Sequence, residues 1–118
     1  MPASNEENEF VNYVVELMQL IGPVSAKRMF GGYGIFLEGL MFGLISDSVL
    51  YLKVDKETER EFISKELEAF TYNKKGKEFK MSYYQAPEEV LEDSEEMSSW
   101  ANKAYGASLK AASKKRNK

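Results

Sequence analysis

Carboxylates are the most numerous ionisable side chains in this chain, and they occur in runs. The 118 residues include 19 Asp and Glu and 16 Lys and Arg, but neither His nor Cys. Acid–base catalysis needs two carboxyl groups in different environments, and a metal site needs convergent oxygen ligands. The acidic runs instead fall where helices are expected to start, so the helix dipole and solvent account for them. We therefore expect neither a catalytic site nor a metal site.

The missing residue types narrow the chemistry further. Without His the chain cannot build a Ser-His-Asp triad, a Cys-His pair or an HExxH zinc site, and without Cys it has no thiolate ligands or disulfides. We expect a protein that is not an enzyme and takes no cofactor. No signal peptide and no apolar run of about 20 residues is present, which predicts a cytoplasmic protein that does not enter a membrane.

A glycine cluster, Gly31-Gly32-Tyr33-Gly34, has the residue type that cradles phosphates. A phosphate cradle needs glycines at a strand-to-helix turn, so that a helix N-terminus faces the phosphate. Strand-like residues follow Gly34 here, and no Gly-Lys-Ser/Thr sequence is present. The cluster therefore favours close backbone packing, a bulge or strong strand curvature.

Basic residues gather at two places in an otherwise acidic chain. Up to Leu109 the net charge is −8, and from Lys110 onward it is +5. The patch within the body is formed by Lys74, Lys75, Lys77 and Lys80. These lysines are possible nucleic-acid contacts, or else a charged hairpin tip that resists edge pairing. We expect residues 1–112 to form one domain and 113–118 a flexible basic tail.

The elements that must position these groups follow from hydrophobic period and turn residues. Helical spacing predicts a helix over 5–21, and strand-like runs follow at 30–36, 41–45 and 49–54. Their short spacing requires an antiparallel meander. Tight hairpin loops are predicted at Glu38-Gly39 and, between the last two strands, over 73–77. A helix over 56–67 capped by Asp55, strands over 69–72 and 78–84, a helical turn from 86 and a helix starting at Asp93 or Ser94 complete the chain. The inward helix positions are predicted to be Phe62, Ile63, Leu67, Met97, Trp100, Ala101, Ala104 and Leu109.

The aromatic residues on the predicted strands have two possible roles. Sheets that stack bases use aromatics beside basic groups, but strand aromatics also fill the core of a small domain. The set comprises Phe30, Tyr33, Phe36, Tyr51, Tyr72, Tyr83 and Tyr84. Tyr83 and Tyr84 are adjacent and must point to opposite faces of a strand, so one is either exposed or covered by something outside the core.

Several separated blocks resemble the TfoX N-terminal domain family of competence regulators. They are residues 28–36 (RMFGGYGIF), Met41-Phe42, 50–54 (LYLKV), 70–72 (FTY), 81–84 (MSYY) and Pro87-Glu88. The likeness covers about residues 10–110. It implies an α-β-β-β-α-β-β-α antiparallel sheet with packed helices, as in bacterial secretion chaperones. This order agrees with the α+β order predicted from hydrophobic period.

The resemblance also implies a bacterial regulator of competence-specific gene expression, a co-activator that works with the cyclic-AMP receptor protein. Longer members carry a second, C-terminal domain that this sequence lacks. We expect a protein-interaction module whose partner is a transcription regulator or a second copy of itself. The predicted partner-binding residues are Arg28, Tyr33, Lys53 and Tyr83. Direct nucleic-acid binding through the basic hairpin and tail, or binding of a small molecule, are the alternatives.

Overall fold

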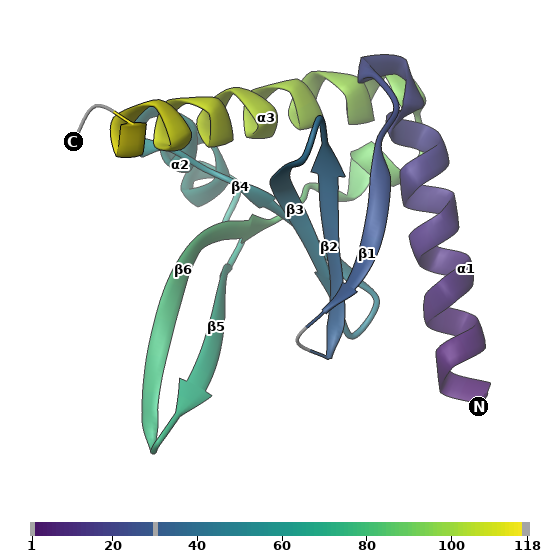
Figure 1. Cartoon of the computed structure of the whole chain (residues 1–118), viewed down its shortest axis with the longest axis horizontal. Coiled ribbons are helices and arrows are strands. Elements are labelled where there is room, and N and C mark those ends of the chain that lie inside the picture. Colours follow the sequence, from purple (N-terminus) through teal and green to yellow (C-terminus); the bar gives the residue numbers. More distant parts are fainter. Residues whose placement is uncertain (1, 30, 117–118) are drawn as a thin grey trace.

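A computed structural model describes residues 2–29 and 31–116 (Figure 1). The described residues form three helices, two 3₁₀ turns and one sheet. The helical elements are α1 (Pro2–Leu17), η1 (Met18–Ile21), α2 (Lys56–Ser64), η2 (Glu88–Leu91) and α3 (Ser94–Arg116). The strands are β1 (Ser25–Met29), β2 (Gly32–Leu37), β3 (Leu40–Ser46), β4 (Val49–Lys53), β5 (Ala69–Lys74) and β6 (Lys77–Gln85).

The strands form one antiparallel sheet in the order β1-β2-β3-β4-β6-β5. This confirms the α+β class and the antiparallel meander. The sheet has one more strand than predicted, because β1 pairs with β2 along the stretch Ser25–Met29. Its sequence, SAKRM, carries little strand signal, and only the pairing with β2 makes it extended. Phe30, where a strand was predicted to begin, lies outside the described residues.

Three two-residue turns fix the register of the hairpins. The central residues Glu38-Gly39, Asp47-Ser48 and Lys75-Gly76 all have positive φ, between 52° and 78°. Positive φ at both central positions is the pattern of a type I′ turn, whose twist matches that of the strands it joins. The predicted hairpin loop at Glu38-Gly39 is confirmed, and the loop predicted over 73–77 is reduced to Lys75-Gly76.

Gly32, Tyr33 and Gly34 of the glycine cluster lie in strand β2, Gly31 lies in the turn before it, and no helix follows directly. A Cβ built on Gly32 would lie 2.2 Å from the backbone oxygen of Ile45 on β3, so no side chain fits there. The β2–β3 register then shifts between Ile35 and Phe36. Close backbone packing, one of the roles predicted for the cluster, is confirmed at Gly32, whereas the register shift lies beyond the cluster.

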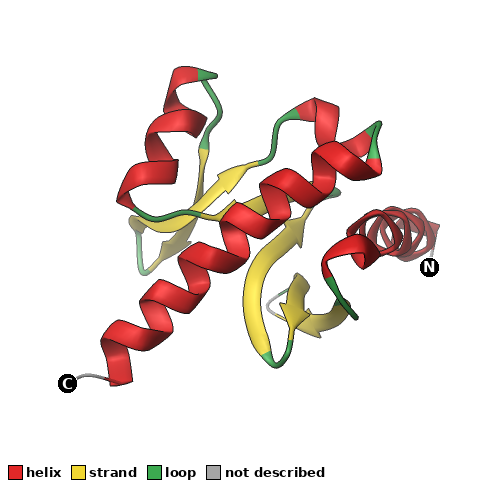
Figure 2. Cartoon of the chain, turned by 90° about the horizontal axis from the view of Figure 1, so that it is seen from above, coloured by secondary structure: helices red, strands yellow, loops and turns green. Residues whose placement is uncertain are grey.

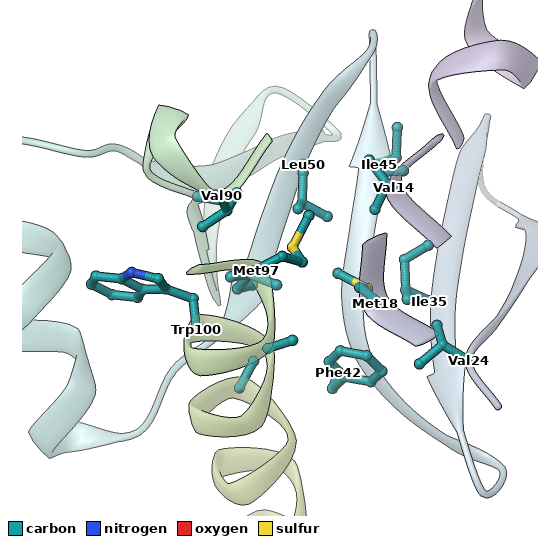
Figure 3. Packing of buried hydrophobic residues seen from close by; sticks show 14 of the residues in the cluster. Val14, Met18, Val24, Ile35, Phe42, Ile45, Leu50, Val90, Met97 and Trp100 are labelled. Atoms are coloured by element: carbon teal, nitrogen blue, oxygen red, sulfur yellow. The ribbon is translucent and has the colours of Figure 1, made fainter. Parts of the chain in front are cut away.

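The core fills the space between one face of the sheet, α1 and α3 (Figure 3). Val14 and Met18 reach it from the N-terminal helical segment, and Met97 and Trp100 from α3; of these only Trp100, at 7%, retains any exposed surface. Strand residues such as Ile35, Phe42, Ile45 and Leu50 meet them. Seen from above, α3 crosses the strands diagonally, with α1 beside its N-terminal half (Figure 2).

Helix α3 buries the predicted residues Met97, Trp100, Ala101 and Ala104, but not Leu109, which is 49% exposed. An α-helix turns about 100° per residue, so Leu109 lies about 180° from Trp100. Ser108 is buried in its place and donates a hydrogen bond from Oγ to the backbone oxygen of Met41 at 2.8 Å. The helix also continues to Arg116, beyond the domain end predicted at residue 112.

Helix α2 starts at the predicted cap. An oxygen of Asp55 accepts from the backbone N–H groups of Glu57 and Thr58 at 2.9 and 2.8 Å, and Thr58 Oγ1 accepts from the Asp55 N–H at 3.0 Å. The helix ends at Ser64 instead of near Leu67, because Glu66 adopts positive φ. Phe62 is buried as predicted, but Ile63 is 55% exposed and was placed wrongly.

No helix in the described ranges is both long and apolar enough to cross a membrane.

The glycine cluster gives a first prediction. Gly32→Ala forces its Cβ against the Ile45 carbonyl and should lower the free energy of unfolding by about 2–3 kcal/mol, as overpacking does. Gly106→Ala is the control: a Cβ on this α3 residue meets nothing within 4 Å, so the change should raise stability by about 0.5–1 kcal/mol. Urea unfolding of both variants measures the contrast. Equal effects would contradict the packing role of Gly32.

The cap of α2 gives a second prediction. The backbone N–H of Thr58 holds the pKa of Asp55 below its ordinary value of 3.8, so the ionised carboxylate stabilises the folded chain above that pH. The stabilisation is lost as pH falls through the lower, folded-state pKa. Asp55→Ala should cost about 1 kcal/mol near neutral pH.

The matched variant Asp55→Asn keeps a capping oxygen without the charge. It should be less destabilised than Asp55→Ala, and its disadvantage relative to the native chain should shrink as pH falls below the native pKa. Denaturant unfolding at neutral and acid pH checks both points. A disadvantage that grows on acidification would contradict this assignment.

Candidate interaction surfaces

The face of the sheet opposite the core carries a row of large apolar side chains. None of them belongs to the core cluster or packs against it. We call this surface the second face, and its large apolar members are Met29, Phe36, Met41, Leu44, Tyr51, Phe70 and Tyr83. Cross-strand pairing places Phe36 opposite Met41 and Leu44 opposite Tyr51, so these side chains project to the same side.

Gly34 lies at the centre of the second face. The position that a Cβ would take there is 2.7 Å from Met29 Sδ, 2.9 Å from Phe36 Cε1 and 3.3 Å from Met41 Sδ. Three side chains from three strands therefore meet over the glycine. Because Gly34 has no side chain, it lets two flexible thioethers and one ring form a continuous apolar patch.

Further along the second face, aromatic rings continue the patch. Tyr51 and Phe70 form an edge-to-face pair with ring centroids 5.0 Å apart. Leu44 is fully buried, whereas Met41, Tyr51 and Phe70 are each partly exposed. Antiparallel sheets with one face toward water normally present polar residues there. A contiguous apolar patch that is partly exposed is typical of an interaction surface.

The structure separates the four predicted partner-binding residues into two pairs. Arg28 and Tyr33 are cross-strand partners on the face that bears α1. Arg28 Nη1 donates to the Tyr33 hydroxyl at 3.4 Å, and this hydroxyl also donates to Asn8 Oδ1 on α1. Arg28 is exposed, but Tyr33 is buried. The Tyr33 ring therefore fixes α1 against the sheet.

Lys53 and Tyr83, the other pair, lie on the second face. The Lys53 ammonium lies 5.3 Å from the centroid of the Tyr83 ring. Burial raises the pKa of Tyr83 to about 12, so its hydroxyl stays neutral. The adjacent Tyr84 points into the core and donates to Glu59 Oε2 at 2.8 Å. Both tyrosines are buried, Tyr83 by contacts outside the core. Alternation along the strand had allowed one of them to be exposed, but neither is.

The β5–β6 hairpin is a second candidate surface, because it extends away from the rest of the chain (Figure 1). All residues from Thr71 to Lys80 are exposed. We call these ten residues the hairpin arm. Tyr72 and Phe79, which pair across it, stack with ring centroids 5.4 Å apart and stay 42% and 41% exposed.

The predicted basic patch coincides with the hairpin arm. Lys80 lies at its base, with Nζ 3.7 Å from Glu59 Oε2 on α2. Lys74, Lys75 and Lys77 surround the turn, and no carboxylate of the described residues lies within 4.0 Å of them. Three lysines are thus available to an external anion, and the fourth is held by the body.

The basic C-terminal segment is partly engaged by the body of the domain. Lys110 Nζ lies 3.1 Å from Asp55 Oδ2 and 3.6 Å from Glu57 Oε1, which ties α3 to the start of α2. A depression of about 260 Å³ adjoins this salt bridge, and Asp55 and Lys110 both line it. The charged side chains that line it are those of Lys53, Asp55, Lys56, Glu59, Lys110 and Lys114, so the Asp55–Lys110 pair neutralises only part of its charge. The described residues contain no group of three or more His, Cys, Asp and Glu placed to hold a metal ion.

The sequence analysis missed five apolar members of these surfaces: Met29, Met41, Leu44, Phe70 and Phe79. Met29 was missed because β1 was not predicted, and without that strand it has no assigned face. Strict alternation along β3 would place Met41 on the same face as the core residue Ile45, whereas the structure places it opposite Phe36 on the second face. The register shift between Ile35 and Phe36 is the reason, because it moves the period along β3 by one residue.

The fold and its surfaces define a small α+β domain with two candidate interaction surfaces. A family model described as the TfoX N-terminal domain matches residues 16–108. The chain therefore belongs to the TfoX N-terminal domain family, as the separated sequence blocks predicted.

Three relatives are named for DNA transformation or as Sxy. The chain is similar to DNA transformation protein TfoX of Haemophilus influenzae (34% identity; 74% of this chain, 42% of the relative). It is also similar to DNA transformation protein TfoX1 of Aliivibrio fischeri (33% identity; 72% and 39%). Protein Sxy of Escherichia coli is 22% identical over 83% of this chain and 47% of its own length. The matched region spans less than half the length of each relative.

The turn of the hairpin arm gives a third prediction. Lys75 has φ of 53°, a left-handed conformation that asparagine adopts more readily. Lys75→Asn should stabilise the hairpin by about 0.5–1 kcal/mol. Lys77→Asn is the control, because it removes the same charge at a residue without positive φ. Amide hydrogen exchange across β5 and β6 distinguishes the two; equal protection in both variants would show that charge, and not backbone strain, limits the hairpin.

Proposed function

We propose that this chain is a protein-interaction module that regulates competence-specific gene expression as a co-activator. In this role the second face docks on a transcription-regulating protein. The observation that carries the proposal is the apolar patch over Gly34, where Met29, Phe36 and Met41 meet outside the core and stay partly exposed. Membership of the TfoX N-terminal domain family and the names of the relatives support competence as the process that the chain regulates.

The charge of the chain supports a DNA-binding protein as the partner. Residues 1–109 carry a net charge of −8, so the body repels nucleic acid and attracts basic protein surfaces. Proteins that bind DNA carry such basic surfaces. An acidic module with an apolar centre fits the usual anatomy of an interface, in which an apolar core is surrounded by a polar rim.

The cyclic-AMP receptor protein is the partner that we would test. The interface variant is Met41→Glu with Phe70→Glu, which places two charges in the patch. The control is Leu20→Glu with Ile63→Glu, because both residues are exposed hydrophobics on helical segments away from the second face, at 66% and 55%. Each pair adds the same charge to the chain.

Binding to the immobilised receptor protein should fall at least about tenfold in the interface variant, since burying an unpaired charge at an interface costs more than about 1.4 kcal/mol. The control should bind like the native chain. Thermal unfolding of both variants checks that they remain folded. Equal losses in the two variants, or no binding by the native chain, would refute docking on this partner through the second face.

A further inference from the structure

The hairpin arm differs in charge from the rest of the chain up to Leu109. Its ten residues contain four lysines and one glutamate, a net charge of +3. The remaining residues up to Leu109 contain seven basic and 18 acidic side chains. The arm is therefore a basic extension of an acidic body, and its exposure on both faces lets it contact a ligand that the body does not touch.

The lysines of the arm are placed against one another. Lys74 and Lys77 are direct cross-strand partners, and Lys75 occupies the turn between them. Like charges directly opposite on adjacent strands destabilise a sheet. The left-handed conformation of Lys75 adds strain at the same turn. Neither feature helps the hairpin to fold, and a polyanion bound at the turn would relieve the repulsion between the lysines.

We propose that the hairpin arm binds double-stranded DNA, with its lysine-bearing turn inserted in the major groove. A two-stranded ribbon fits this groove, which is about 12 Å wide and 8.5 Å deep. From Thr71 to Lys75 the arm extends about 13 Å at about 3.3 Å per residue. The turn therefore reaches the groove while the acidic body remains outside it.

Each part of the arm has a role in this complex. Lys74, Lys75 and Lys77 contact phosphates on the two sides of the groove. The exposed Tyr72–Phe79 stack lies two residues further from the turn on each strand than Lys74 and Lys77 do. It offers an apolar surface to thymine methyl groups and sugars. Lys80 stays at the base with Glu59 and fixes the arm to α2. The contact is mainly to phosphates, so it is largely independent of base sequence.

The test is a fluorescence-anisotropy titration of a labelled duplex of about 20 base pairs with the whole chain. If the arm neutralises three phosphates, the logarithm of the association constant should fall with the logarithm of the salt concentration with a slope of about −2.7. Affinity should therefore fall about 40-fold between about 50 and 200 mM salt. The same oligonucleotide as a single strand should bind more weakly, because it has no groove.

Two triple variants distinguish an effect of the lysines of the arm from an effect of the net charge of the chain. Replacing Lys74, Lys75 and Lys77 by Gln should lower affinity at low salt at least about tenfold and bring the salt slope close to zero. The control replaces Lys27, Lys56 and Arg60, three exposed cations outside the arm, by Gln, which changes the net charge equally. This variant should keep the native slope. Phe79→Ala should weaken binding about fivefold and leave the slope unchanged.

Three results would overturn the proposal: no binding of the duplex at low salt, equal losses in the two triple variants, or tighter binding of the single strand than of the duplex. Protein docking through the second face is measured independently with the Met41→Glu and Phe70→Glu variant. Failure of one proposal therefore leaves the other untouched.

Discussion

Helix α3 is the element on which the rest of the fold depends. Its Met97 and Trp100 are buried against the sheet, and Ala101 and Ala104 let the helix approach the strands closely. The same helix contacts η1, η2, β3 and β4, so it joins the N-terminal helical segment to both halves of the sheet. Burial of this stripe stabilises the fold, because apolar burial contributes roughly 25 cal/mol per Å².

The position of α3 determines which surfaces are left for binding. The helical residues of the core cluster pack against one face of the sheet, so the apolar side chains of the second face lie outside that core, and Met41, Tyr51 and Phe70 among them stay partly exposed. The β5–β6 hairpin is anchored at its base, where Tyr84 and Lys80 both contact Glu59 of α2. Its outer part, the hairpin arm, is exposed. The domain thus presents an apolar sheet face and a basic hairpin, which suit ligands of different chemistry.

The two surfaces are compatible with one role. A protein that docks on a DNA-bound regulator through an apolar face would be held beside the duplex, where even a weak contact by three lysines gains from high local concentration. The acidic body would limit non-specific attachment elsewhere on DNA. In this arrangement the second face selects the partner, and the hairpin arm adds affinity that depends on salt.

The sequence by itself determined the α+β class, the family, the cap at Asp55, the tight turn at Glu38-Gly39 and the inward stripe of α3 up to Ala104. These follow from local geometry and periodicity, which a single chain segment carries. Only the tertiary structure decided that Ser25–Met29 is a strand, that Tyr33 and Tyr83 are buried on opposite faces, and that Lys80 is held by Glu59 whereas Lys74, Lys75 and Lys77 are not. The physical reason is that strand pairing, bulges and salt bridges join residues far apart in sequence, and no local pattern specifies such contacts.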